Sequence, residues 1–251
     1  MINPPHAFNI PIHTGNLDLE KDTISPGVYI FANAYTWVNY LQNPSFNKVV
    51  KTSPCVFADG VGTLIPCQLH SGLSPSRISG TEFTHHYLSK WPQKPMLFIG
   101  GSQAGYEIIK KKYGLTNTKQ IIPPFQDFTP NQIPKDLQDL NPLNLWEVSK
   151  NNPEAVWVCL GSPKQELWAM EAQRFLPTSK FFPIGAAFAF LSQEKKRAPQ
   201  GMQTLGLEWL YRLLQNPRQH FKRCLVGNSL LLIYTLHFLF QQTHSSKKSI
   251  R

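Results

Sequence analysis

The stretch Ala155-Val-Trp-Val-Cys-Leu-Gly161-Ser162-Pro163 joins a short apolar run to a glycine and a helix start. The segments Cys55-Val-Phe-Ala-Asp59-Gly60 and Met96-Leu-Phe-Ile-Gly100-Gly101 have the same form, and the second leads into a helical pattern over residues 104–112. A fourth apolar run covers residues 27–32. Strands that alternate with helices form a parallel sheet covered on both faces. The sequence therefore predicts a Rossmann-like α/β fold with helices on both faces of the sheet.

A polar residue or a glycine follows each candidate strand. These residues are Asn33, Asp59, Gly100 and Ser162. In open parallel sheets, ligands bind beyond the carboxyl ends of the strands. We therefore expect one site to gather these four residues.

The positive charge is concentrated at the end of the chain. Residues 194–251 hold ten lysines and arginines against two glutamates, and so carry +8 of the net charge of +10. Such asymmetry suggests that a near-neutral core is followed by a basic accessory segment. We expect a core over residues 1–192 and a basic, mostly helical appendage over residues 193–251.

The appendage contains an apolar run over residues 225–240, shortly after Arg218, Lys222 and Arg223. With 16 residues, this run is shorter than the roughly 20 that a membrane-spanning helix needs. Cations beside an apolar face are typical of helices that lie in the membrane interface. We therefore expect the three basic residues to dock the protein on an anionic membrane surface, and a buried helix is the alternative.

The composition excludes several classes of protein. With 41% hydrophobic and 16% charged residues, the chain forms a core and is not a disordered segment. Cys55 and Cys159 lie in apolar runs, as expected for reduced cysteines in the cytoplasm. Residues 1–13 lack the basic and apolar regions of a signal peptide. A nucleic-acid-binding protein is disfavoured because the basic residues are not interleaved with an aromatic platform.

Asp59 is a candidate general base. A carboxylate at the end of a strand, followed by Gly60, can lie in a cleft and accept a proton from an attacking hydroxyl. A residue of this type also stabilises turns, through an Asx-turn or a cap. Position alone leaves both interpretations open.

Two hypotheses of equal weight explain the residues of the segment Gly161-Ser-Pro-Lys-Gln-Glu166. In the first, Ser162 is an N-cap, Pro163 is the first helical residue and Gln165 completes a capping box. In the second, the helix N-terminus binds phosphate. Gly100-Gly101-Ser102 is a weaker phosphate signal, because it matches neither G-x-x-x-x-G-K-[ST] nor G-x-G-x-x-G.

No metal centre and no cofactor are predicted. The sequence contains no D-x-D motif for a metal-bound diphosphate. His85 and His86 are adjacent, so a helix would point them to different faces. They are expected to be ordinary surface or core histidines.

Taken together, the motifs resemble the WecG/TagA/CpsF family, which is glycosyltransferase family twenty-six. The resemblance covers roughly residues 25–235. It rests on an ordered set of motifs: Ala58-Asp-Gly-Val-Gly62, Arg77-Ile-Ser-Gly80, Gly161-Ser-Pro-Lys-Gln-Glu-Leu-Trp168, Phe182-Pro-Ile-Gly-Ala-Ala-Phe188, Lys196-Arg-Ala-Pro199 and Leu205-Gly-Leu-Glu-Trp-Leu-Tyr-Arg-Leu-Leu214.

The resemblance implies an inverting, metal-independent transfer of an N-acetylmannosamine-like sugar. The implied donor is a UDP-sugar and the implied acceptor is an undecaprenyl-diphosphate-linked sugar, in the biosynthesis of a cell-surface polysaccharide or a teichoic-acid-type polymer. The implied location is the cytoplasm, peripheral on the inner face of the plasma membrane. A homo-oligomer is left open.

The resemblance also implies roles for individual residues. Asp59 matches the general base, and Arg77 and Gln165 match its neighbours at the donor diphosphate and the acceptor. The residues expected to bind the donor are Asn33, Gly100, Gly101, Gly161, Ser162, Gly185 and Arg212.

Three positions depart from the family pattern. Phe31 stands where many members have threonine, Ala189 where aspartate is frequent, and Ser192 where glycine is common. The donor sugar is therefore open. Because a fold alone does not settle function, a non-catalytic nucleotide-sugar-binding protein is the alternative.

Overall fold

The computed structural model describes residues 12–14, 16–60, 63–64, 75–123 and 152–217, with positions 227, 229–230, 232–233 and 235–236. One parallel sheet contains, in spatial order, β1 (Gly27–Val28), β7 (Lys180–Pro183), β6 (Ala155–Cys159), β4 (Met96–Gly100) and β5 (Thr118–Ile121). A second parallel pair joins β2 (Ile30–Ala32) to β3 (Val56–Ala58).

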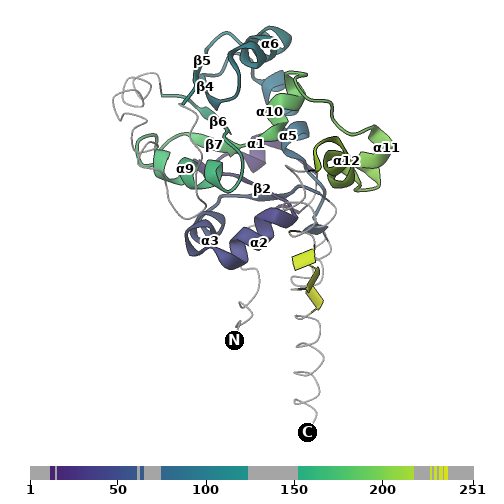
Figure 1. Cartoon of the computed structure of the whole chain (residues 1–251). Coiled ribbons are helices and arrows are strands. Elements are labelled where there is room, and N and C mark those ends of the chain that lie inside the picture. Colours follow the sequence, from purple (N-terminus) through teal and green to yellow (C-terminus); the bar gives the residue numbers. More distant parts are fainter. Residues whose placement is uncertain are drawn as a thin grey trace.

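Helices cover both faces of this parallel arrangement (Figure 1). One face packs against α2 (Ala34–Gln42), α3 (Pro44–Lys51) and α9 (Lys164–Ala172). The other face packs against α1 (Leu19–Asp22), α5 (Gly80–Lys90), α6 (Gln103–Tyr113) and α10 (Ala186–Leu191). The predicted Rossmann-like α/β fold is confirmed.

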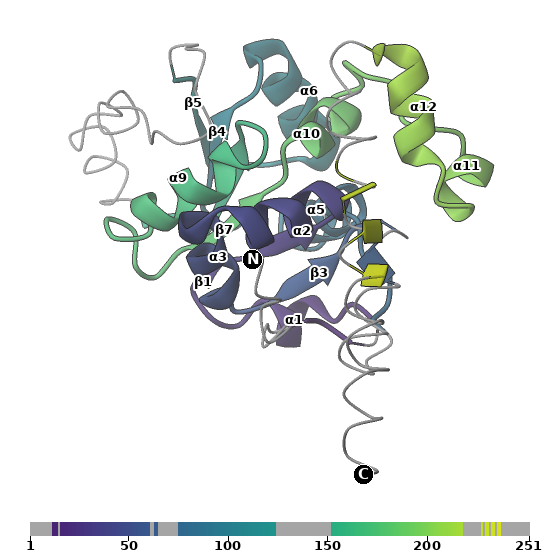
Figure 2. The ribbon, with the colours of Figure 1, turned by 60° about the horizontal axis from the view of Figure 1, so that its bottom comes forward.

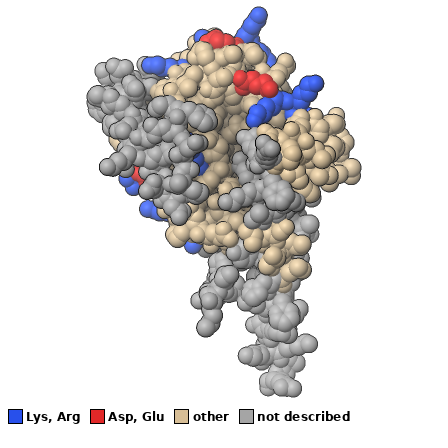
Figure 3. Space-filling view, in the orientation of Figure 1, with Lys and Arg blue, Asp and Glu red and all other residues tan. Residues whose placement is uncertain are grey.

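Two further helices, α11 (Gln200–Thr204) and α12 (Glu208–Gln215), stand at one side of the body (Figure 2). Charged side chains gather over α6 and along the chain that leads from α10 towards α11 (Figure 3). Glu194, Lys195 and Lys196 in that connection are exposed. The body and α11–α12 together position the site described below.

The alternation of side chains along the strands builds two separate cores. On β6, Val156 and Val158 point into the core beneath α2, α3 and α9, whereas Trp157 points into the core beneath α5. Trp157 stacks on Phe182 of β7 with ring centroids 4.8 Å apart. Because both faces are buried, the strand is a continuous apolar run and does not alternate with polar residues.

The expected strand over residues 27–32 is two strands. The backbone N–H of Tyr29 donates to Phe181 O at 2.9 Å, whereas that of Ile30 donates to Cys55 O at 3.2 Å. The chain thus changes its partner from β7 to β3 at Tyr29. The prediction of one uninterrupted strand was wrong because the apolar pattern does not specify which neighbour each residue pairs with.

The predicted boundary between residues 192 and 193 falls directly after α10. The division into a core and an appendage stays a prediction. Arg218, Lys222 and Arg223, and most of the apolar run over residues 225–240, lie outside the described residues. Within the described part of the chain, no helix is long and apolar enough to cross a membrane.

Candidate active site

A pocket of about 230 Å³ lies beyond the carboxyl ends of β2, β3, β6 and β7, against α11 and α12. Eight of the ten residues predicted to be catalytic or to bind the donor line it. They are Asn33, Asp59, Arg77, Gly161, Ser162, Gln165, Gly185 and Arg212. The expectation that one site gathers Asn33, Asp59 and Ser162 is confirmed by this arrangement.

Asp59 is placed in the pocket by the end of β3. Its backbone N–H donates to Ala32 O on β2 at 2.8 Å, which fixes the residue directly beyond the two strands. Arg77 comes alongside because its backbone forms a parallel bridge with Ala58, and the next residue, Ile78, donates to Ala58 O at 3.0 Å. Residues 18 apart in the chain are thus held at the same strand end.

The side chain of Asp59 is partly buried, and burial raises the pKa of its carboxyl to about 6. The positive charge of Arg212 opposes this rise most strongly, and the charges of Arg77 and Arg197 oppose it less. The negative charge of Glu208 acts in the same direction as burial. A carboxyl with a pKa close to neutral pH is suited to proton transfer.

Arg212 reaches the pocket from α12. Its Nη2 donates to Oε1 of Glu208, which lies one helical turn earlier on the same helix. The guanidinium carbon lies 5.0 Å from the ring centroid of Phe190. The Nε atom of Arg212 is buried and has no hydrogen-bond partner among the residues that the structure describes. Buried polar groups are normally satisfied, so this donor is one that an anionic ligand would satisfy.

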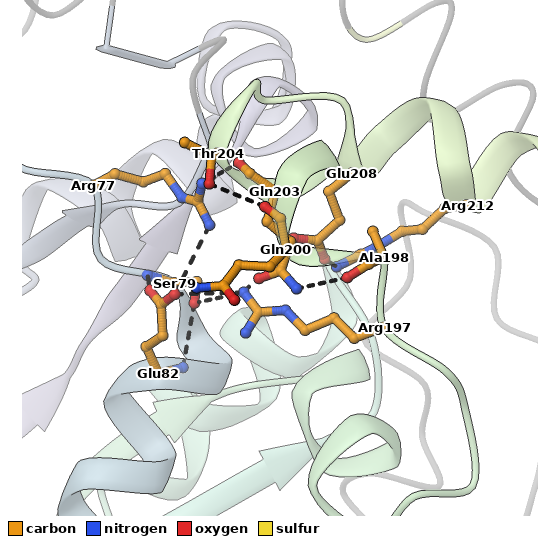
Figure 4. Close-up of polar contacts among 10 residues, drawn as sticks. All are labelled: Arg77, Ser79, Glu82, Arg197, Ala198, Gln200, Gln203, Thr204, Glu208 and Arg212. Carbon is orange, nitrogen blue, oxygen red and sulfur yellow. Dashed lines mark hydrogen bonds and ion pairs between the residues drawn. The ribbon is translucent and has the colours of Figure 1, made fainter.

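A second set of contacts holds α11 and α12 against the start of α5 (Figure 4). Arg77 Nη1 donates to Gln203 O at 2.5 Å. Arg197 Nη2 donates to Ser79 Oγ at 3.2 Å and lies 3.7 Å from carboxylate oxygens of both Glu82 and Glu208. Residues more than a hundred positions apart are thereby joined beside the pocket.

Of the two hypotheses for the start of α9, the capping box was wrong. The helix begins at Lys164 after Pro163 as its N-cap, without a side-chain cap. The Oγ of Ser162 is buried and has no hydrogen-bond partner in the structure. Ser162 lies one residue too early to cap the helix, and Gln165 does not turn back towards it.

Gln165 instead ties together the ends of two strands. Its Oε1 accepts a hydrogen bond from Gly161 N at 3.1 Å, after β6, and its Nε2 donates to Pro183 O on β7 at 3.0 Å. The same Nε2 donates to Glu166 Oε1 at 3.0 Å. A Cβ atom at Gly185 would lie only 3.0 Å from Gln165 Oε1, so this position favours glycine by both space and its φ of +49°.

Asn33 has a local structural role besides lining the pocket. Its Oδ1 accepts hydrogen bonds from Tyr35 N and Thr36 N, and its own N–H donates to Thr36 Oγ1 at 3.2 Å. These contacts form a capping box at the start of α2. The side-chain oxygen of Asn33 is thus committed to the helix.

Gly100 and Gly101 do not line the pocket. Packing accounts for glycine at the second position, because a Cβ atom at Gly101 would lie 2.6 Å from the ring of Phe188. At Gly100 a Cβ atom would lie 2.9 Å from Leu160. The expectation that Gly100 joins the other strand-end residues was therefore wrong, since the turn after β4 folds under α10.

The three departures from the family pattern differ in their positions. Phe31 lines the pocket, whereas Ala189 and Ser192 do not. The ring of Phe31 stacks on Phe57 with centroids 5.4 Å apart and meets Phe83 edge-on at 5.1 Å. Phe31 therefore gives the pocket an apolar, aromatic wall close to Asp59.

Sequence reasoning did not single out Glu208, Arg197 or Trp209. Glu208 and Trp209 line the pocket, and Arg197 reaches Glu208. One signal was present in the chain: Glu208 precedes Arg212 by four residues, the spacing that places two side chains on the same face of a helix.

The histidines and cysteines follow the sequence-based expectation. His85 and His86 are exposed on α5, and His85 Nδ1 lies 2.9 Å from Tyr113 Oη. Cys55 is buried and Cys159 partly buried, and both are free thiols. Among the residues that the structure describes, no three histidine, cysteine, aspartate or glutamate side chains converge as metal ligands do.

Parallel α/β folds in which a proton acceptor and several cations face one pocket are typical of enzymes that transfer groups from phosphorylated donors. The comparison with known families indicates that the transferred group is a sugar. Residues 8–245 match the Glycosyl transferase WecG/TagA/CpsF family, and the chain belongs to this family of glycosyltransferases. The resemblance found from the motifs is thereby confirmed.

One relative is the N-acetylglucosaminyldiphosphoundecaprenol N-acetyl-beta-D-mannosaminyltransferase of Bacillus spizizenii. It is 26% identical to this chain over 216 residues. The match covers 84% of this chain and 78% of the relative. The similarity thus extends over most of both proteins.

Proposed function

We propose that the protein transfers an N-acetylmannosamine-like sugar from a UDP donor to an undecaprenyl-diphosphate-linked sugar, with inversion at the transferred carbon. The observation that carries this proposal is the placement of Asp59, with its raised pKa, in one pocket with Arg77 and Arg212. The family and the name of the Bacillus spizizenii relative support the substrate class.

In the proposed reaction, Asp59 is the general base. Its carboxylate accepts the proton of an acceptor hydroxyl as the hydroxyl oxygen attacks the anomeric carbon of the donor sugar. A new carbon–oxygen bond forms while the bond between the sugar and UDP breaks. One displacement of this kind inverts the configuration at the anomeric carbon, and it requires a single base.

The leaving UDP carries the negative charge that develops in this step. Arg212 and Arg77 are the proposed groups that stabilise this charge, because guanidinium groups bind phosphate oxygens through several donors. The unpartnered Nε of Arg212 supports this role. Ser162 Oγ, also buried and unpartnered, is a further donor to the diphosphate in this proposal. With these groups, the proposed transfer does not use a metal ion.

The acceptor places the reaction at a membrane surface. A polyprenyl chain stays in the bilayer, so the proposed enzyme works as a peripheral protein on the inner face of the plasma membrane. Arg218, Lys222 and Arg223 are proposed to bind anionic headgroups, each worth about 1 kcal/mol near an anionic leaflet. Charge reversal at Arg218 and Arg223 should weaken sedimentation with anionic vesicles but leave transfer to a soluble acceptor analogue largely intact.

The function is tested with the full-length chain, a set of UDP-sugars and a lipid-diphosphate-linked N-acetylglucosamine acceptor. Released UDP and the lipid-linked product are both measured. We expect product with UDP-N-acetylmannosamine, of inverted anomeric configuration, and the same rate in the presence of a chelator. A product formed only with another donor would correct the sugar. Binding of UDP-sugars without any transfer would instead support a non-catalytic binding protein.

A further inference from the structure

Glu208 is the first residue of α12, and its carboxylate lies between two arginines beside the pocket (Figure 4). We infer that Glu208 is a positioning residue for the proposed transfer: it holds the guanidinium of Arg212 at the pocket and keeps a negative charge close to Asp59. This inference rests on the proposed function, and goes beyond it by assigning a role to a residue that does not itself react.

The first part of the inference follows from the contacts of the carboxylate. Oε1 of Glu208 accepts a hydrogen bond from Arg212 Nη2, and Oε2 lies 3.7 Å from Arg197 Nη2. Arg197 is in turn bonded to Ser79 at the start of α5. Both oxygens of Glu208 are therefore engaged, and the carboxylate is fixed to a helix of the body as well as to its own helix.

Arg212 is consequently held from two sides. The carboxylate of Glu208 contacts one end of the guanidinium, and the ring of Phe190 lies 5.0 Å from its central carbon. A glutamate that precedes its cationic partner by four residues has the favourable orientation for a helical pair. The long side chain of Arg212 is thus ordered before a ligand arrives, which lowers the entropy lost on binding.

The second part follows from the balance of charge around Asp59. The charges that act most on Asp59 are those of Arg212 and Glu208 from α12, Arg77 from the segment before α5, and Arg197 from the segment before α11, and Glu166 of α9 also lines the pocket. Of the four charges that act most, three are positive and one is negative. Without Glu208 the three arginines would be opposed less, although Glu82 still lies 3.9 Å from Arg77 and 3.7 Å from Arg197. They would then stabilise the carboxylate of Asp59 more and make it a weaker base.

A purely structural ion pair is the ordinary alternative, and the chain contains one for comparison. Glu171, in the last turn of α9, and Arg174, in the turn that follows the helix, form an ion pair at 2.9 Å, with side chains 33% and 69% exposed. Neither residue lines the pocket. Glu208 and Arg212 are less exposed, at 19% and 35%, and both line it. Glu171→Gln is therefore the matched control for Glu208→Gln.

The charge effect is measured without any transfer reaction. The ¹³C resonance of the Asp59 carboxyl, identified by its absence in Asp59→Asn, is followed by NMR as the pH is changed. In Glu208→Gln we expect the titration midpoint of Asp59 to fall by on the order of one pH unit, because a nearby like charge has been removed. In Glu171→Gln the midpoint should not move. An unchanged midpoint in Glu208→Gln would overturn the charge role.

The positioning effect is measured with UDP by calorimetry. Glutamine keeps an oxygen that accepts from Arg212, so Glu208→Gln should bind UDP within about twofold of the unaltered protein. Alanine removes that acceptor, so Glu208→Ala should bind UDP on the order of tenfold more weakly, provided that its melting curve shows a folded protein. Unchanged UDP affinity in Glu208→Ala would overturn the positioning role. If the unaltered protein transferred no sugar, the proposed function would fail while both measurements would still decide the role of Glu208.

Discussion

Two carboxylates, one at the amino ends and one at the carboxyl ends of the parallel strands, interact differently with nearby cations. At the amino ends of β6 and β7, Glu154 Oε1 accepts hydrogen bonds from Lys94 at 2.6 Å and Lys180 at 3.0 Å. Burial alone would raise the pKa of Glu154, but the two lysines hold it below its ordinary value. At the carboxyl ends of β2 and β3, burial raises the pKa of Asp59 to about 6 although Arg212 is near.

The two carboxylates also differ in what the nearby lysines and arginines bond to. Both lysines donate directly to Glu154, so its charge is neutralised by hydrogen bonds. Around Asp59 the arginines are engaged elsewhere: Arg212 and Arg197 with Glu208, and Arg77 with Gln203. Proximity of opposite charge is therefore not enough to tell a structural carboxylate from the proposed general base. Burial is the main cause of the raised pKa of Asp59, and the hydrogen bonds that Arg212 and Arg77 make elsewhere weaken what opposes it.

The largest expected effect is that of Asp59→Asn. Removal of a general base lowers turnover by on the order of 10²–10⁴.

The Asp59→Asn variant should also melt at a higher temperature than the unaltered protein at pH 8. The raised pKa means that Asp59 favours the folded state below its ordinary value of 3.8, and that this stability is lost as the pH rises through about 6.

Turnover and melting temperature, measured across pH on one preparation, check this prediction. The gain in melting temperature should largely disappear at pH 3.5, where Asp59 is protonated in the folded state and mostly protonated in the unfolded state. Near-normal turnover in a folded Asp59→Asn would remove Asp59 from the chemistry.

The next effect is that of Arg212→Ala. If this cation stabilises the leaving diphosphate, its removal should lower turnover by on the order of 10². Arg212→Lys keeps the charge but loses the planar set of donors, so it should recover only part of the loss. Arg174→Ala, which removes a 69% exposed arginine from the turn after α9, is the control and should retain full turnover. Equal rates for the two alanine variants would contradict the role of Arg212.

Gln165→Ala should affect stability as well as activity. The side chain is buried and joins the ends of β6 and β7, so its loss leaves Gly161 N and Pro183 O without their partner. We expect the free energy of unfolding to fall by about 1–3 kcal/mol, the usual cost of buried polar groups left unsatisfied. Chemical denaturation measures this change. A loss of turnover with an unchanged denaturation midpoint would instead point to a direct contact with a ligand.

The smallest effect on the reaction is expected for Glu154→Gln. At pH 7 the free energy of unfolding should fall by about 1–2 kcal/mol, because two charge-assisted hydrogen bonds are lost from a side chain that is 30% exposed. Because the folded-state pKa is lowered, this stability is present above the ordinary value of 4.5 and is lost as the pH falls. Turnover should be unchanged, and its loss would show that the two ends of the sheet are coupled.

The sequence predicted the parts of the site that depend on strand ends. An apolar run followed by Asp59 or by Gly161-Ser162 is sufficient to place these residues at the carboxyl edge of a parallel sheet, and the pocket contains them. Phe31 was marked as unusual from the sequence, and it lines the pocket.

The parts that depend on long-range packing were missed. Gly100 resembles a ligand-binding turn in sequence, yet the connection after β4 packs under Phe188 and lies away from the pocket. The hydrogen bond of Gln165 to Pro183 was missed because Pro183 lies on a strand that local spacing does not place next to it. Glu208 shows its importance only when Arg197 and Asp59 are brought beside it by the fold.

Four of the tryptophans differ in exposure, and this difference makes Trp209 an intrinsic fluorescence probe of the pocket. Trp209 lines the pocket and is 37% exposed, whereas Trp37, Trp157 and Trp168 are buried in the two cores. A ligand that enters the pocket changes the surroundings of Trp209 and leaves those of the three buried rings as they are. Binding of a ligand in the pocket should therefore change the part of the emission spectrum that comes from Trp209.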